Sequence, residues 1–225
     1  MRLGLLGGSF NPIHRCHLSI ARSARQLLQL DRVLFIPTGD PPHKQPGTLA
    51  AASHRHRMVQ LAIQDTPEFA LTDIEIQRSG KSYSIDTVRA IQQEYGPDTV
   101  LFFIIGLDAF LDLPSWKEAD TLLKSCHFVV ISRPSTSFQA MAAIPLFRDV
   151  PQTTLTALDE VRQERADVAI TNGQALTFLR LPPCDVSASE IRARLRSGAS
   201  LANLLPTPVE SYILREELYR EDSER

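Results

Sequence analysis

The stretch Leu3-Gly4-Leu5-Leu6-Gly7-Gly8-Ser9-Phe10-Asn11-Pro12-Ile13-His14-Arg15-Cys16-His17 decides the fold of this chain. It begins with a short apolar run of strand type and continues into a turn that holds two glycines, an Asn-Pro and two histidines. From Leu18 onward, apolar residues recur at helical spacing, at Ala21, Ala24 and Leu28. The pattern predicts a strand, a loop and a helix, with His17 at or near the helix start.

A turn of this kind can bind a phosphate. The start of a helix directs backbone N–H groups and the positive end of the helix dipole toward one place, which favours an anion. Gly7 and Gly8 have no Cβ, so a ligand can approach the backbone closely, and Ser9 adds a hydroxyl. His14 and His17 lie three residues apart, so both imidazoles can face one phosphate. A turn without a ligand and two solvated histidines form the alternative that these residues alone leave open.

Cysteine spacing gives little support for a metal site or for disulfides. Zinc ligation by His14, Cys16 and His17 is disfavoured, because Cys16 and His17 are adjacent and no second ligand pair at zinc-finger spacing follows. Cys16, Cys126 and Cys184 are an odd number of cysteines without paired spacing. We therefore expect reduced thiols, as in a cytoplasmic protein, and no metal held by the protein's own side chains.

Length and charge narrow the class of protein. The 225 residues suffice for one sizeable core, and we expect a single domain over residues 1–225. The formal net charge of −2 argues against a general nucleic-acid binder, which usually carries a basic excess. No apolar run approaches the ~20 residues that span a bilayer, so we expect neither a membrane span nor a signal segment. The sequence leaves the oligomeric state open.

Apolar runs along the chain predict an α/β fold. They lie at residues 33–36, 69–71, 100–105, 128–131 and 178–181, and read as buried strands. We expect a doubly wound, Rossmann-like fold with a mostly parallel sheet of about five strands. Residues 135–177 are a candidate insertion or lid, with a mostly solvated helix over 155–165. Residues 187–225 form a helical C-terminal part, closed by a helix over 206–219 whose apolar face holds Val209, Ile213 and Leu214.

Polar residues follow several of these strands at their carboxyl ends, where ligands of such sheets gather. Gly106 lets a flat base or a ribose approach, and Asp108 can accept from ribose hydroxyls or cap a helix. Arg133 leaves the next strand in the same way. Trp116 is the single tryptophan and follows in a polar loop, although a lone tryptophan is usually core.

The presence of other polar residues can be explained by the starts of predicted helices. Ser84 begins a predicted helix whose first turn has hydroxyl and carboxylate groups for capping. Ser187 and Glu190 have the spacing of a capping box, which leaves Arg192 unexplained. The basic run 54–57 is expected to be the solvated start of a helix over 54–64, with Met58, Leu61 and Ala62 on its apolar face.

Gly7-Gly8-Ser9-Phe10-Asn11-Pro12-Ile13-His14-x-x-His17 resembles the signature of the nucleotidyltransferase superfamily with the His-x-Gly-His motif. Members attach a nucleotide to a phosphate-bearing acceptor. Pro41-Pro42-His43-Lys44, the Tyr83-Ser84 segment, Gly106-x-Asp108, Trp116 and Ser187-Ala188-Ser189-x-Ile191-Arg192 follow in family order and resemble the nicotinate-mononucleotide adenylyltransferase branch. The chain departs from the pattern at Cys16, where the family usually has glycine, and at Ala188 and Ser189.

The resemblance implies transfer of AMP from ATP to nicotinate mononucleotide, which gives nicotinate adenine dinucleotide and pyrophosphate in NAD biosynthesis. It implies Mg²⁺ carried on the ATP phosphates. The catalytic residues it implies are His14, His17, Lys44 and Arg192. The ATP-binding residues are Gly7, Gly8, Ser9, Phe10, His14, His17, Gly106, Asp108, Ser187, Ser189 and Arg192. The residues for the nicotinate nucleotide are Asn11, Lys44, Tyr83, Ser84, Trp116 and Arg133.

Two alternatives stay open at this point. One is a sister enzyme of the superfamily, such as a pantetheine-phosphate adenylyltransferase or a cytidylyltransferase, against which the Tyr83-Ser84 and Trp116 segments argue. The other is a nucleotide-binding sensor that has lost catalysis, with Cys16 as the lesion.

Overall fold

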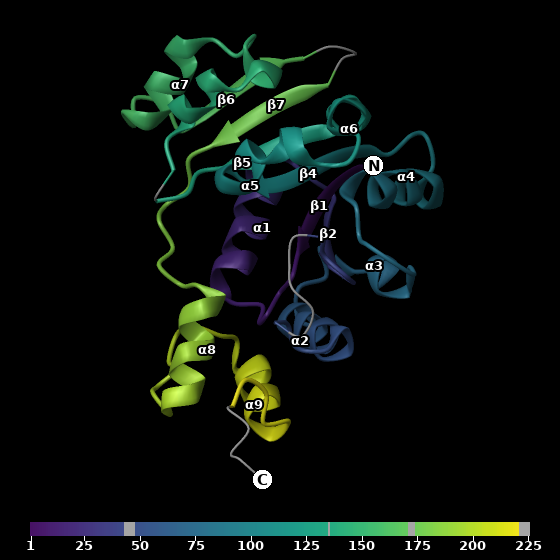
Figure 1. Ribbon diagram of the computed structural model, residues 1–225, viewed down its shortest axis with the longest axis vertical. Coiled ribbons are helices and arrows are strands. Elements are labelled where there is room, and N and C mark those ends of the chain that lie inside the picture. The colour runs from purple at the N-terminus through teal and green to yellow at the C-terminus, as the bar shows by residue number, and fades with distance from the viewer. Residues whose placement is uncertain (43–47, 135, 171–173, 221–225) are drawn as a thin grey trace. The chain divides into compact units, whose positions relative to one another are not determined.

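The computed structural model describes residues 1–42, 48–134, 136–170 and 174–220 (Figure 1). Its contacts divide the chain into two compact units. The first comprises Met1–Leu6, Ser23–Arg32 and Tyr83–Pro183, and the second comprises Gly7–Arg22, Val33–Ser82 and Cys184–Arg225. The single domain expected from the sequence stays a prediction.

Within the described residues the sheet has seven strands, in the order β3-β2-β1-β4-β5-β7-β6. Their bounds are β1 Arg2–Gly8, β2 Arg32–Pro37, β3 Phe69–Leu71, β4 Val100–Gly106, β5 His127–Ile131, β6 Arg165–Ala169 and β7 Ala175–Leu179. The mostly parallel α/β sheet is confirmed, since β1–β4, β2–β3, β4–β5 and β5–β7 pair in parallel and β6 pairs antiparallel with β7. The expected number of about five strands is too low. β6 escapes recognition because it is an edge strand with a mostly exposed, mixed sequence.

The first unit is built on the most apolar strands. β1 and β4 pair in parallel with Leu3 opposite Leu101, and β4 pairs with β5 with Phe103 opposite Phe128. These side chains are at most 7% exposed, as continuous apolar runs covered on both faces should be. The helices here are α4 Ser84–Tyr95, α5 Leu107–Leu111, η1 Leu113–Ser115, α6 Ala119–Ser125, η2 Phe138–Ala143, η3 Pro145–Phe147 and α7 Gln152–Asp159.

The described residues of the segment predicted as an insertion or lid, 136–170 and 174–177, add helix α7 and strand β6 to the first unit and begin strand β7. α7 lies beside β6, which pairs with β7 (Figure 1). The expected helix over 155–165 is wrong at its end, because the chain leaves the helix at Asp159 and enters β6 at Arg165. The expected strand at 178–181 begins earlier, at Ala175, and ends at Leu179. A lid function stays a prediction.

The second unit gathers the chain around the carboxyl ends of β1 and β2. The N–H of Thr38 donates to the carbonyl of Gly8 at 2.9 Å, so the two strand ends lie together. The helices of this unit are α2 Ala52–Ile63, α3 Ile74–Gln77, α8 Ala188–Ser197 and α9 Thr207–Arg215, and α1 Arg15–Leu28 begins in it. Leu18, Ala21, Ala24 and Leu28 of α1 are all buried, as their spacing predicts.

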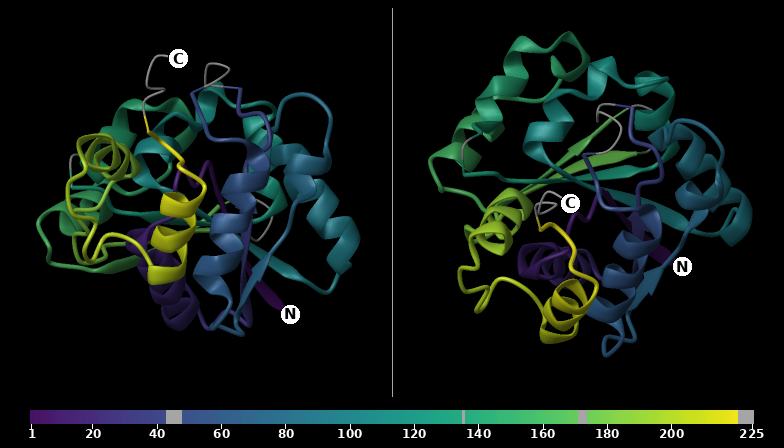
Figure 2. Two further views of the ribbon diagram at one scale, coloured as in Figure 1. Left: turned by 90° about the horizontal axis from the view of Figure 1, so that it is seen from below. Right: turned by 60° about the horizontal axis from the view of Figure 1, so that its bottom comes forward.

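Helices α2 and α9 pack side by side (Figure 2). His54 and Tyr212 join them through a hydrogen bond of 2.8 Å between Nδ1 and the hydroxyl. Val209 and Ile213 are fully buried, as expected, but Leu214 is 46% exposed. Tyr212 takes its place at 8% exposure, since Val209, Tyr212 and Ile213 share one helical stripe at spacings of three and four.

Among the helices of the described ranges, none combines the length and apolar character needed to cross a membrane. The cytoplasmic location expected from the sequence stays a prediction.

Candidate functional site

The loop between β1 and α1, residues 7–13, is called the glycine loop here. A Cβ added at Gly7 would meet no atom within 4 Å, whereas one at Gly8 would lie 3.3 Å from the Phe10 ring. Gly7 is also exposed. The backbone at Gly7 therefore borders open space, which is what close approach of a ligand requires.

Phe10 has an unusual backbone in this loop. Its φ is 44°, in the left-handed region that bulky residues rarely adopt, and its side chain is 1% exposed. The ring packs against Phe35 at a centroid distance of 5.9 Å and meets the His17 ring edge-on at 5.1 Å. A cis peptide bond joins Asn11 and Pro12. Left-handed backbone at a buried bulky residue is a form of strain that clusters at functional sites.

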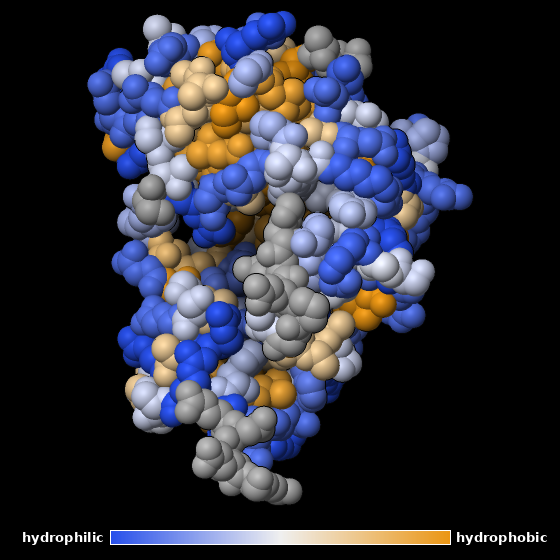
Figure 3. Space-filling model, in the orientation of Figure 1, coloured by the Kyte–Doolittle hydropathy of each residue, from blue (hydrophilic) through white to orange (hydrophobic). Residues whose placement is uncertain are grey.

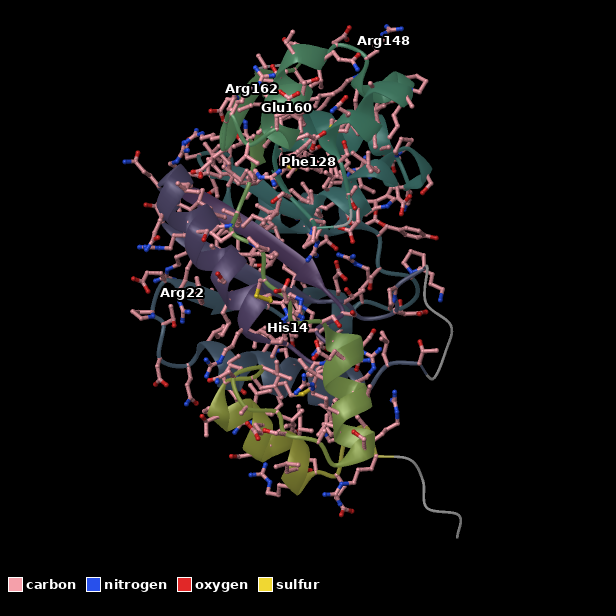
Figure 4. The ribbon with its side chains drawn as sticks, turned by 90° about the vertical axis from the view of Figure 1, so that its left-hand side faces the viewer. His14, Arg22, Phe128, Arg148, Glu160 and Arg162 are labelled. Carbon is pink, nitrogen blue, oxygen red and sulfur yellow. A yellow bond between two sulfur atoms is a disulfide. The ribbon has the colours of Figure 1, made fainter. Side chains whose placement is uncertain are left out.

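His14 and His17 come together as predicted. Their ring centroids are 3.8 Å apart, and His14 lies just before α1 (Figure 4). The N–H of His14 donates to Nδ1 of His17 at 3.2 Å, and the N–H of His17 donates to the carbonyl of His14 at 3.0 Å. Because Nδ1 of His17 accepts, the neutral ring carries its proton on Nε2. His17 can therefore donate a hydrogen bond through Nε2.

The start of α8 holds the predicted Ser187, Ser189 and Arg192, and Arg192 reaches the glycine loop. The Ser187 hydroxyl caps the helix by accepting the N–H of Glu190 at 3.1 Å. Arg192 donates from Nη1 to the carbonyl of Asn11 at 2.7 Å and from Nη2 to the Ser189 hydroxyl at 3.2 Å. These bonds use two of the five guanidinium N–H donors. The surface of α8 is mainly hydrophilic (Figure 3).

The predicted capping box at α8 is only half formed. Glu190 does not complete it, because its carboxylate pairs with Arg194 at 2.7 Å, one helical turn further on. At α4 the expected side-chain cap is wrong. Tyr83 holds the N-cap position without a side-chain cap hydrogen bond, and Ser84 is already the first helical residue.

Asn11 is 3% exposed and engaged within the protein. Its side-chain oxygen accepts the N–H of Ala50 at 3.0 Å and the hydroxyl of Tyr219 at 2.8 Å. An amide oxygen has two lone pairs, so these two bonds occupy it. The contact of Asn11 with an acceptor nucleotide stays a prediction.

The cysteines depart from expectation. Cys16 and Cys184 form a disulfide, visible as a yellow bond near His14 in Figure 4. Their Cα atoms are 5.8 Å apart, close to the most common distance for disulfides. The expectation of reduced thiols fails because the partners lie 168 residues apart, and sequence spacing cannot show that the fold brings them together. Cys126 is buried and free, and burial raises the pKa of its thiol.

We expect this disulfide to stabilise the second unit. Reduction with dithiothreitol, or Cys184→Ser, should lower the free energy of unfolding by about 2–4 kcal/mol, because the cross-link restricts a long loop in the unfolded chain. Denaturant unfolding with and without reductant measures the difference. Thiol titration should find one reactive group per unfolded chain before reduction and three after it. Identical unfolding curves would show that the cross-link contributes nothing.

In the first unit, the predicted Gly106, Asp108 and Arg133 lie together. A Cβ added at Gly106 would lie 2.5 Å from Oδ1 of Asp108 and 2.7 Å from Nε of Arg133. Asp108 and Arg133 form an ion pair of 3.2 Å, with both side chains exposed. The absence of a side chain at Gly106 is what makes room for this pair.

Tyr83 and Trp116 lie near the start of α4 and after η1, also in the first unit. Nζ of Lys117 lies 4.9 Å from the centre of the Tyr83 ring and 2.9 Å from the carboxylate of Asp86. Trp116 is half-buried and meets Phe103 edge-on at 6.4 Å. Lys44, predicted as a catalytic and acceptor-binding residue, lies outside the described residues.

Two residues that touch the glycine loop are missing from the predicted site. Arg55 is 2% exposed, so its assignment to a solvated helix start is wrong. It shares a helical stripe with Met58 and Val59, at spacings of three and four, and that spacing is the signal in the sequence. Tyr219 reaches Asn11 from a segment far along the chain, and no local pattern indicates it.

Burial affects the protonation of both residues. It lowers the pKa of the Arg55 guanidinium, an effect that the nearby Tyr219 and Glu75 oppose. Burial raises the pKa of the Tyr219 hydroxyl, which stays protonated and can donate at neutral pH. Across the described ranges, no group of three or more His, Cys, Asp or Glu side chains is placed to hold a metal ion.

Comparison with known proteins gives consistent matches. The family described as cytidylyltransferase-like matches residues 5–194. A protein of Geobacter metallireducens named "Probable nicotinate-nucleotide adenylyltransferase" is 41% identical over 222 residues, 99% of this chain and 100% of its own length. One of Citrifermentans bemidjiense with the same name is 42% identical, over 97% of this chain and 98% of its own.

A solved structure has the same fold. The nicotinic acid mononucleotide adenylyltransferase of Plasmodium falciparum, complexed with NaAD, superimposes with a TM-score of 0.71 and covers 97% of both chains at 19% identity.

Proposed function

The chain belongs to the cytidylyltransferase-like family, and we propose that it transfers AMP from ATP to nicotinate mononucleotide, which yields nicotinate adenine dinucleotide and pyrophosphate. The observation that carries the proposal is the full-length similarity, at 41% identity, to a relative named for nicotinate-nucleotide adenylyltransferase activity. The paired histidines beside the open backbone at Gly7 supply a chemical basis for it.

In this reaction the protein forms no covalent bond with the substrate. The nucleophile is the phosphate of the acceptor, which is largely dianionic at neutral pH because the second pKa of a phosphate monoester is about 6. Catalysis then consists of alignment and of stabilising the charge that develops on the α-phosphate and on pyrophosphate. No protein nucleophile is required, and Cys16 is engaged in a disulfide.

Residues of the second unit suit the phosphate part of this task. We assign to Nε2 of His17 a hydrogen bond to the α-phosphate, with His14 stacked beside it. The remaining donors of Arg192 bind the β- and γ-phosphates, with Ser187, Ser189 and Lys44 as further ligands. Mg²⁺ enters as part of the substrate, bound to the phosphates of ATP.

Residues of the first unit suit the nucleosides. We assign Gly106 and Asp108 to adenosine, where the carboxylate can accept from ribose hydroxyls. Tyr83, Ser84, Trp116 and Arg133 are assigned to the acceptor nucleotide. These assignments follow the resemblance of the motifs in the sequence, and the contacts of Asp108 with Arg133 and of Lys117 with Tyr83 are compatible with them.

A panel of acceptors tests the proposal against its alternatives. The purified full-length protein is incubated with ATP, Mg²⁺ and one acceptor at a time, and products are separated by chromatography and identified by mass. Nicotinate mononucleotide should give dinucleotide and an equal amount of pyrophosphate. Product from phosphopantetheine, or from CTP with a phosphorylated acceptor, would instead identify a sister enzyme. Nucleotide binding without any product would identify a sensor.

Arg192→Ala should raise the KM for ATP by at least ~10-fold, the equivalent of one charge-assisted hydrogen bond. The KM for nicotinate mononucleotide should change less than threefold, because the arginine faces the triphosphate in this assignment. Arg196→Ala, an exposed arginine on the same helix, is the matched control and should leave both constants unchanged. Equal increases for both substrates would mean that Arg192 acts only by supporting the glycine loop through Asn11.

A further inference from the structure

The guanidinium of Arg55 donates hydrogen bonds to three backbone carbonyls. From α2 it donates through Nε to Ala50 at 2.9 Å, through Nη1 to Ser9 at 2.9 Å and through Nη2 to Gly39 at 3.3 Å. Gly39 follows β2, so one side chain joins the loop after β2 to the glycine loop. At Gly39 an added Cβ would lie 2.1 Å from the carbonyl oxygen of Glu75, so this position has no room for a side chain.

The bond to Ser9 fixes a particular peptide plane. The carbonyl of Ser9 belongs to the peptide that leads into Phe10, the residue with left-handed backbone. In the described residues this carbonyl lies outside the helices and strands, and Arg55 donates a hydrogen bond to it. If the peptide rotates, the Phe10 ring leaves its edge-on contact with His17, 5.1 Å away. A path of contacts therefore runs from Arg55 through the Ser9 peptide and the Phe10 ring to His17.

Tyr219 holds the other side of the same turn. Its hydroxyl donates to the side-chain oxygen of Asn11 at 2.8 Å, and the N–H of Ala50 donates to the same oxygen. Ala50 in turn gives its carbonyl to Arg55. The residues on both sides of Phe10 are therefore fixed by one connected network that starts from α2 and from the segment after α9.

We infer that Arg55 and Tyr219 are positioning residues for AMP transfer, which fix the Ser9 carbonyl and the Asn11 side chain on either side of Phe10 and thereby the donor of His17. The inference rests on the proposed function for its kinetic consequence, but its structural consequence for His17 does not depend on activity. Neither side chain is assigned a contact with substrate.

A purely structural role would predict something different. Burying a guanidinium is costly, and an apolar side chain on this stripe of α2 beside Met58 and Val59 would serve packing equally well. Packing also gives no reason for a hydroxyl at Tyr219, since phenylalanine fills the same volume. What these donors supply, and packing does not, is a fixed orientation of the Ser9 carbonyl and of the Asn11 side-chain amide.

The test uses conservative variants. Tyr219→Phe removes one hydroxyl, and Arg55→Lys keeps the charge but loses the planar set of donors. Each should lower kcat by ~10-fold or more, since small misplacement of a catalytic group can cost up to about 10²-fold, with KM for both substrates changed less than threefold. Arg57→Lys, an exposed position on the same helix, is the matched control and should retain kcat.

Imidazole NMR supplies the readout that is independent of turnover. The His17 ring signals, assigned with His17→Gln, should shift in Tyr219→Phe and Arg55→Lys but not in Arg57→Lys, while the melting temperature of Tyr219→Phe stays within a few degrees. Unchanged His17 signals with unchanged kcat in Tyr219→Phe would overturn the inference. If Arg55→Lys does not fold, Tyr219→Phe decides. If the unmodified protein makes no dinucleotide, the proposed function fails, while the His17 signals still decide the positioning role.

Discussion

Replacing His17 with alanine is expected to lower kcat for dinucleotide formation by ~10²-fold or more, the usual cost of removing one donor to a transition state. The reason is the geometry of the ring. Nδ1 of His17 accepts the N–H of His14, so Nε2 is the donor, and the contact with Phe10 keeps the ring in place before substrate arrives. A donor held in advance needs no reorganisation as charge develops on the α-phosphate.

The effect should fall on the chemical step. KM for ATP should change by much less than kcat, because the bond strengthens in the transition state and is weak in the ground state. His56→Ala, a histidine of α2 outside the glycine loop, is the control and should keep kcat within twofold. Steady-state rates at saturating ATP and acceptor measure both variants. A His17→Ala protein with near-normal kcat would exclude the proposed role.

Nicotinate mononucleotide is expected to be preferred over its amide by at least ~10²-fold in kcat/KM. Ser84 is the first residue of α4, where amides have no partner within the helix and the dipole favours an anion. Lys117 lies over the Tyr83 ring, but its charge is balanced by Asp86 at 2.9 Å, so the preference is assigned to the helix start. Both carboxylate oxygens can accept from such donors, whereas the amide would turn its NH₂ toward one of them and leave a donor unpaired, at about 1–3 kcal/mol.

Trp116→Ala separates this recognition from stacking. The indole can stack on the pyridine ring but cannot distinguish a carboxylate from an amide, so the variant should bind both acceptors more weakly and keep much of the preference. Competition between the acid and the amide in one reaction gives the ratio directly. Equal kcat/KM for the two acceptors in the unmodified protein would contradict this account of the acceptor site.

Local pattern predicts the elements and the residues of this chain that act close to their own strand or helix. Buried strands show as apolar runs, and His14 and His17 follow from their place at the start of α1. The edge strand β6 cannot be recognised in this way, because most of its positions are exposed and it lacks an apolar run.

Contacts over long separations escape this kind of prediction. Cys16 and Cys184, and Asn11 and Tyr219, meet only because the fold brings the C-terminal part back to the glycine loop. Arg55 is a different case. Its helical spacing places it on a buried stripe, but a charged side chain is usually expected in solvent. The carbonyls of Ser9, Gly39 and Ala50, which accept its hydrogen bonds, appear only in the folded structure.

The most direct test of the central claim follows oxygen through the reaction. Nicotinate mononucleotide whose phosphate carries ¹⁸O in its non-ester positions is incubated with MgATP and the unmodified protein, and products are weighed by mass spectrometry. Direct attack of the acceptor phosphate on the α-phosphorus predicts nicotinate adenine dinucleotide that retains all the label, unlabelled pyrophosphate, and no AMP attached to the protein. The absence of dinucleotide, label in pyrophosphate, or a nucleotidyl-protein would contradict it.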